Sequence, residues 1–174
     1  MSARSGFFVT ATLVGGAEAT LRSLHPDDYD AVINLSVYLS AEERYQRFFT
    51  VHPTYIGEWA LSLTKPAEAI VALGAFESGE LIGVANYAEL TRPGECEIAV
   101  VVAHEQHERG VGTAVLKALD HIAKDAGLHL FVADVLFEYY AMRRVLHDAG
   151  WHTTQHRDGP VLSVEVDLDA IEAS

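Results

Sequence analysis

The sequence predicts a mixed α/β domain built on one mostly antiparallel sheet that contains a single parallel strand pair. Two apolar runs joined by a glycine turn, within residues 69–90, are typical of an antiparallel meander. A Val-rich run at residues 96–103 is separated from the run at 129–136 by a helical pattern over about 111–126. A helix between two strands usually makes them parallel neighbours. A hairpin candidate at residues 152–168 completes the sheet.

The chain before this sheet is expected to be mainly helical. Residues 1–19 are predicted to form a flexible N-terminal arm, and residues 20–174 a single domain large enough for one core. A short strand at 20–24 leads into a helix that starts at His25-Pro26, with acidic residues in its first turn. Further helices should begin at Ser40, an N-cap candidate with Glu43 in the capping-box position, and near Pro53.

The later elements follow from turn residues and apolar spacing. Ser78-Gly79-Glu80 is a candidate hairpin turn, and Gly127 suits the end of the helix over 111–126. Residues 138–149 are predicted to form the last helix, which closes with Gly150-Trp151.

Composition and charge restrict the partners. The chain is 49% apolar and carries a net charge of −13, from 25 acidic and 12 basic side chains. This charge argues against nucleic acid and anionic membranes as partners, and it suits a basic protein or a polycationic small molecule. The single cysteine, Cys96, excludes an internal disulfide. No apolar run reaches transmembrane length and no signal-peptide pattern is visible, so we expect a cytoplasmic protein.

The turn His107-Glu108-Arg109-Gly110-Val111-Gly112 is a candidate anion site. It follows the Val-rich run and opens a helix, so its glycines let the backbone approach a ligand while the helix N-terminus presents unpaired amides. A phosphate-bearing ligand is therefore predicted here. The spacing of the nine histidines matches no metal-site signature, so no metal is expected.

Glu97 is the candidate catalytic residue. It lies between Cys96 and Ile98 in an apolar run, where a carboxylate is unfavourable unless it faces a cleft or has a partner. A carboxylate in a partly apolar cleft suits the role of a general base. Two alternatives remain open. Glu97 is an edge glutamate paired with Arg92 or another surface cation, or Glu95 is the base.

The element order and the His107–Gly112 turn resemble the GNAT superfamily of acetyl-CoA-dependent N-acetyltransferases over about residues 20–168. Three segments resemble the catalytic domain of bacterial Pat-type protein lysine acetyltransferases: Arg44-Tyr45-Gln46-Arg47-Phe48-Phe49, Glu97-Ile98-Ala99-Val100-Val101-Val102 and Ala141–Trp151.

This resemblance implies helices on both faces of the sheet, a splayed central parallel pair and acetyl-CoA as cosubstrate. It implies that Glu97 is the general base of direct acetyl transfer to an amine. It assigns the pantetheine arm to the backbone of Ala99, Val100 and Val101. It assigns the pyrophosphate to His107, Glu108, Arg109, Gly110, Val111, Gly112 and Thr113.

The chain departs from the family pattern at three positions. His107 replaces the usual Gln or Arg, Tyr139 stands where many members have Asn, and Leu146 stands where many have a tyrosine general acid. Tyr139 and Tyr140 are nearby candidates for that acid. The expected acceptor is a protein lysine, and the alternatives are a small-molecule amine or a non-catalytic acyl-CoA-binding module. The oligomeric state is left open, with a homodimer as one option.

Overall fold

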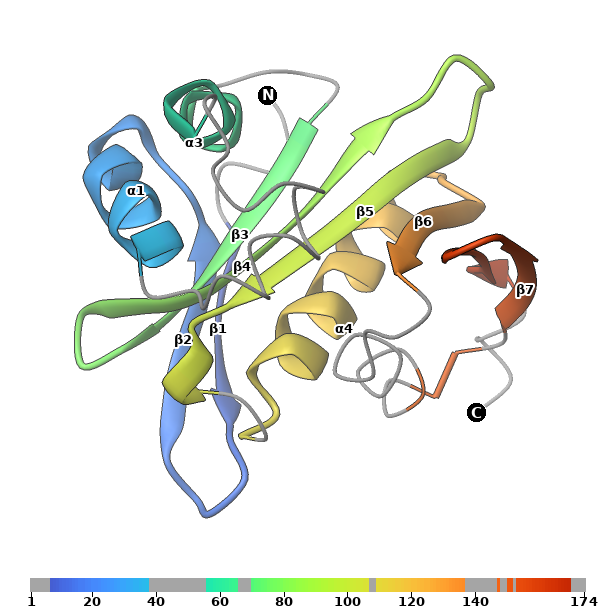
Figure 1. Cartoon of the computed structure of the whole chain (residues 1–174). Helices are drawn as coiled ribbons and strands as arrows, with labels where there is room; N and C mark the ends of the chain where they lie inside the picture. Colours follow the sequence, from blue (N-terminus) through green and yellow to red (C-terminus); the bar gives the residue numbers. More distant parts are fainter. Residues whose placement is uncertain are drawn as a thin grey trace.

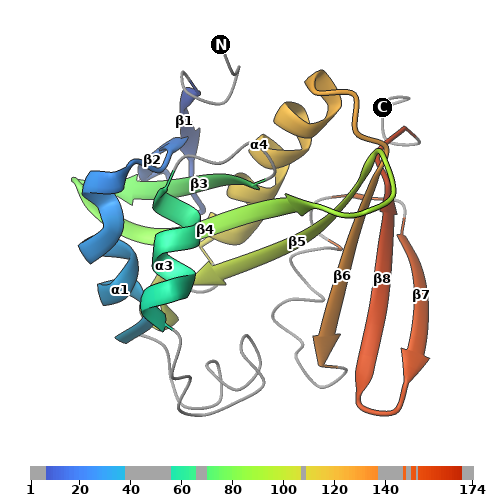
Figure 2. The same ribbon diagram turned by 90° about the horizontal axis from the view of Figure 1, so that it is seen from above.

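The computed structural model describes residues 7–37, 56–65, 70–106, 109–136, 147, 150–151 and 153–169. Its centre is an eight-stranded sheet in the order β1-β2-β3-β4-β5-β6-β8-β7. Figure 1 shows the sheet, and β8 is labelled between β6 and β7 in Figure 2. The strands are β1 (Phe8–Thr12), β2 (Glu18–Ser23), β3 (Ile70–Glu77), β4 (Glu80–Glu89), β5 (Glu95–Val102), β6 (Leu130–Leu136), β7 (Thr153–Asp158) and β8 (Val161–Asp167). Every pair is antiparallel except β5 and β6, which confirms the predicted fold class.

Helices cover both faces of the sheet. The described helical segments are η2 (Pro26–Asp28), α1 (Tyr29–Val37), α3 (Ile56–Thr64), η3 (His104–Gln106) and α4 (Val111–Asp125). Figure 2 shows α1 and α3 on one face and α4 on the other. The helices predicted from Ser40 and over 138–149 lie outside the described residues, apart from His147, which is helical.

The prediction of a flexible arm over residues 1–19 is wrong for residues 8–12 and 18–19, which belong to β1 and β2. Residues 8–12 form β1, which pairs with β2 from Phe8↔Arg22 to Thr12↔Glu18. Gly15 and Gly16 adopt positive φ angles of 93° and 97° in the turn between them. β1 is an edge strand with mostly exposed side chains, so it lacks the apolar alternation by which a buried strand is recognised.

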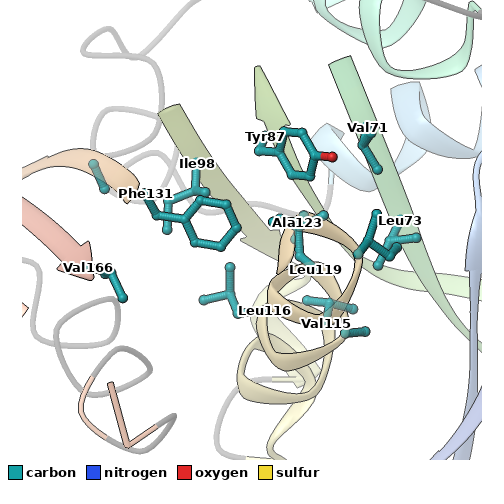
Figure 3. Packing of buried hydrophobic residues seen from close by; sticks show 14 of the residues in the cluster. Val71, Leu73, Tyr87, Ile98, Val115, Leu116, Leu119, Ala123, Phe131 and Val166 are labelled. Atoms are coloured by element: carbon teal, nitrogen blue, oxygen red, sulfur yellow. The ribbon is translucent and has the colours of Figure 1, made fainter. Parts of the chain in front are cut away.

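The larger apolar core lies between the sheet and α4. Leu116, Leu119 and Ala123 of α4 are buried against strand residues that include Tyr87 and Phe131 (Figure 3). The ring centroids of Tyr87 and Phe131 are 5.9 Å apart, a typical distance for stacked or tilted aromatic pairs. A second cluster joins the opposite face of the sheet to α1 and α3.

An ion pair fixes the entry of the chain into α1. The guanidinium of Arg22 on β2 donates two hydrogen bonds of 2.9 Å to the Asp28 carboxylate and lies 4.0 Å from the centre of the Phe76 ring. The same carboxylate accepts a 2.7 Å bond from the His25 amide. Burial alone would raise the pKa of Asp28, but these hydrogen bonds outweigh burial and hold that pKa below its usual value.

Replacement of Asp28 by Asn should lower the free energy of unfolding by about 2 kcal/mol at neutral pH, because a buried charged hydrogen-bond partner is lost. Asp28 has a lowered pKa in the folded state, so its stabilisation is present above its unfolded pKa of about 3.9 and is lost as the pH falls through the folded value. Urea unfolding of both proteins from pH 7 to pH 3 should show the difference shrinking in acid. A difference that stays constant with pH would contradict a charge-dependent role.

Candidate functional site

β5 and β6 pair over only three residues and then separate. Their parallel register runs from Glu95↔Leu130 to Glu97↔Val132. Beyond it, β6 pairs with β8 as far as Leu136↔Val161, and β5 pairs only with β4. Figure 2 shows the two strands meeting at one end and diverging toward the other. The predicted splay is therefore present, and it starts at Glu97.

The β4–β5 register decides which backbone groups of β5 face the splay. Leu90 donates to the Glu95 carbonyl at one end of the ladder, at 2.8 Å, and Ala103 donates to the Ile82 carbonyl at the other end, at 3.0 Å. Backbone direction alternates along an antiparallel strand, so Ala99 and Val101 turn their backbone groups toward β4.

Val100 is out of phase with these residues and directs its N–H and C=O toward the splay. The β5–β6 register gives it no partner in β6. Of the three strand residues predicted to hold a pantetheine arm, Val100 alone has the right backbone direction. Ala99 and Val101 instead direct their side chains to the face that carries α1 and α3.

The N-terminus of α4 has the backbone features of an anion site. Gly110 caps the helix with a φ angle of 83°, a conformation that favours glycine. Ala114 donates to the Gly110 carbonyl at 3.0 Å, which leaves the amides of Val111, Gly112 and Thr113 without an acceptor inside the helix. The first turn contains no acidic side chain. These features fit a phosphate group at the positive end of the helix dipole.

α4 begins close to the sheet because Gly83 of β4 has no side chain. A Cβ atom at Gly83 would lie 2.8 Å from Cγ1 of Val111, too close without a shift of one of them. The helix start is thereby held directly beside β4, near the strand that carries Val100.

The side chain of Arg109 anchors the loop before α4. Its guanidinium donates to both oxygens of Glu77 on β3, at 2.8 and 2.6 Å, and also to the side-chain oxygen of Gln106. We call these three residues the Arg109 clamp. The hydrogen bonds from Arg109 hold the pKa of Glu77 below its usual value. The carbonyl of Arg109 accepts a 2.9 Å bond from the amide of Val14, in the turn after β1. Arg109 therefore shapes the loop and does not point a free charge at a ligand.

Glu97 lies at the last paired position before the splay. It is opposite Ala88 on β4 and Val132 on β6, and its side chain is exposed on the face that carries α1 and α3. Within the described part of the chain it makes no hydrogen bond or ion pair, and Arg92 lies instead 3.8 Å from Glu95. The expected partly apolar cleft is replaced by an open setting, since its neighbours Ala88 and Ala99 are small.

Sequence analysis missed three polar residues of this region. Glu77 could not be assigned because the Arg109–Glu77 bond joins positions 32 residues apart, whereas Gln106 lies only three residues before Arg109 and no motif marks it. Asn86 carried a usable signal, an amide side chain inside an apolar strand. His107 and Glu108, and the candidates Tyr139 and Tyr140, lie outside the described residues.

The described residues contain no group of three or more His, Cys, Asp or Glu side chains placed to hold a metal ion. None of the described helices is both long enough and apolar enough to span a membrane.

The sequence is similar to those of known acetyltransferases. The model of the Acetyltransferase (GNAT) family matches residues 34–151. Acetyltransferase Pat of Mycolicibacterium smegmatis is 29% identical over 157 residues, which is 87% of this chain and 46% of that protein. The chain therefore spans about half the length of this curated relative.

Solved structures share the fold. The GNAT domain of S. lividans PAT superposes with a TM-score of 0.83 at 26% identity, covering 92% of this chain and 96% of that domain. The yncA protein of Salmonella typhimurium, determined with its cofactor acetyl-CoA, has a TM-score of 0.70 at 20% identity and covers 89% of this chain and 96% of its own.

The Arg109 clamp predicts an effect of Glu77 on ligand binding at the loop. Replacement of Glu77 by Gln should weaken coenzyme A binding about threefold, because the loop loses its charged anchor. Calorimetric titration with coenzyme A measures the change, and the exposed Glu80→Gln variant on the same hairpin is the control. Equal affinity of both variants and the parent protein would mean that the clamp does not position the loop.

Proposed function

The chain belongs to the GNAT family of acetyltransferases, and from this premise we propose that it transfers the acetyl group of acetyl-CoA to lysine side chains of proteins. The observation that carries the proposal is the splay of β5 and β6. Glu97 and Val100 both lie on β5, Glu97 where the splay starts and Val100 with its backbone N–H and C=O directed into it. The N-terminus of α4, the helix that follows β5, supplies unpaired amides.

Acetyl-CoA is proposed to bind along the splay. The amides of Val111, Gly112 and Thr113 would receive the pyrophosphate, together with the loop residues His107, Glu108, Arg109 and Gly110. The backbone of Val100 would pair with the pantetheine amides. Its neighbours Ala99 and Val101 would hold it in place through their pairing with β4. This arrangement presents the thioester beside Ala99, two residues from Glu97.

Glu97 is proposed as the general base. A lysine amine is mostly an ammonium near neutral pH and must lose a proton before it can attack. The proton passes to Glu97, directly or through water. The nitrogen then bonds to the acetyl carbon and the C–S bond breaks. The second proton that the nitrogen loses passes to the leaving thiolate, so that an amide and the coenzyme A thiol are the products.

A protein lysine is the acceptor that the setting of Glu97 favours. An exposed carboxylate beside small side chains can be reached by a lysine that projects from a folded protein. The net charge of −13 attracts a basic partner. A location in the cytoplasm, a reaction without a metal and a homodimeric assembly stay predictions from the sequence.

The acceptor class can be tested with a panel of lysine peptides, a folded lysine-rich protein, spermidine and other small amines. We expect kcat/KM to be highest for lysine in a polypeptide. A preference for the free amines would assign the chain to small-molecule acetylation. Tight coenzyme binding without turnover on any amine would instead support the non-catalytic binding module.

Replacement of Glu97 by Gln should leave the dissociation constant for acetyl-CoA unchanged and lower kcat about 100-fold or more, because the general base is lost. Steady-state rates and equilibrium binding measure the two quantities. Glu95→Gln is the matched control, since Glu95 lies two residues away on the same face and is the alternative base. The assignment fails if Glu95→Gln carries the loss or if Glu97→Gln turns over normally.

A further inference from the structure

Asn86, between Ala85 and Tyr87, is the residue of β4 that carries a side-chain amide. Asparagine is depleted in strands because its amide neither packs well nor completes the backbone ladder. The strand residues on either side of it are fully buried, whereas Asn86 is half-buried. Its position in the strand therefore calls for a reason other than packing.

The register places Asn86 between two alanines. Ala72 of β3 lies opposite it on one side and Ala99 of β5 on the other. Such small neighbours leave the amide uncovered at its sides. Among the described residues, no hydrogen bond to the Asn86 side chain is formed.

Asn86 and Glu97 project from the same face of the sheet. Glu97 pairs with Ala88, two residues along β4 from Asn86, so the two polar residues are diagonal neighbours. Diagonal neighbours in an antiparallel pair have Cα atoms about 7–8 Å apart, with side chains that can reach a common atom. Ala99 lies between them and leaves that space open.

We propose that Asn86 is a positioning residue that holds the acceptor amine beside Glu97; this inference rests on the proposed acetyl transfer. The carbonyl oxygen of Asn86 accepts one N–H of the amine, directly or through a water molecule. Another N–H proton passes to Glu97. Loss of that proton creates the lone pair of the nitrogen, which is turned toward the thioester carbon beside Ala99. The C–N bond forms there as the C–S bond breaks, and the third ammonium proton passes to the leaving thiolate.

A matched pair of variants tests the role of the oxygen. Asn86→Thr and Asn86→Val have nearly the same shape and both suit a strand, so they differ in a hydroxyl that can accept the same hydrogen bond. We expect Asn86→Val to lower kcat/KM for the acceptor about tenfold, the effect of one lost hydrogen bond. Asn86→Thr should retain kcat/KM within about threefold of the parent protein, because its hydroxyl can replace the amide oxygen. The dissociation constant for acetyl-CoA should be the same in all three proteins.

The melting temperature and the exposed Asn34→Ala variant on α1 serve as controls for folding. Equal acceptor kinetics in the Thr and Val variants, both close to the parent protein, would overturn the role of Asn86. Equal losses in both variants would also overturn it, because packing alone would then explain them. A parent protein that transfers acetyl to no amine would refute the proposed function itself, which is a distinct outcome.

Discussion

The short parallel register between β5 and β6 is the constraint on which the candidate site depends. A strand inside a sheet normally satisfies its backbone groups on both edges, and an unpaired buried amide or carbonyl is costly. Here β6 follows β8 for seven residues and leaves β5 after Glu97. The backbone N–H and C=O of Val100 thus have no partner in β6. Unpaired strand groups of this kind can pair with an extended ligand that carries amide groups of its own.

A ligand that pairs with Val100 can also reach the N-terminus of α4 only if the loop before this helix has a fixed position. Three contacts from distant parts of the chain fix it. Gly83 admits Val111 to the surface of the sheet, Glu77 binds the guanidinium of Arg109, and Val14 binds its carbonyl. Through the contact of Val14, the hairpin of β1 and β2 helps to hold the loop before α4 in place, although β1 lies at one edge of the sheet.

The features that could be predicted from the sequence are those that depend on residues close together in the chain. The apolar strands, the Gly110 turn and the helix after it are continuous segments, and the parallel pair follows from their order. β1 could not be predicted, because an exposed edge strand has little apolar alternation. The clamp joins residues far apart in the chain. The open setting of Glu97 depends on the small size of residues opposite it, such as Ala88, which alternation within β5 cannot reveal.

Residue 99 separates the two halves of the proposed reaction. The backbone of Val100 faces the splay, whereas the side chain of Ala99 faces the surface that holds Asn86 and Glu97. In the proposed reaction, the thioester is held by the backbone of Val100 and the amine by Asn86 and Glu97. Only the side chain of Ala99 lies between these two positions. Farther along the same face, Val84 and Val101 are buried in the cluster that includes residues of α1 and α3, so this face is closed on that side. In the proposed reaction the acceptor approaches from the side of Glu97, the last residue of β5 that pairs with β6, and alanine at position 99 leaves it room to reach the carbonyl.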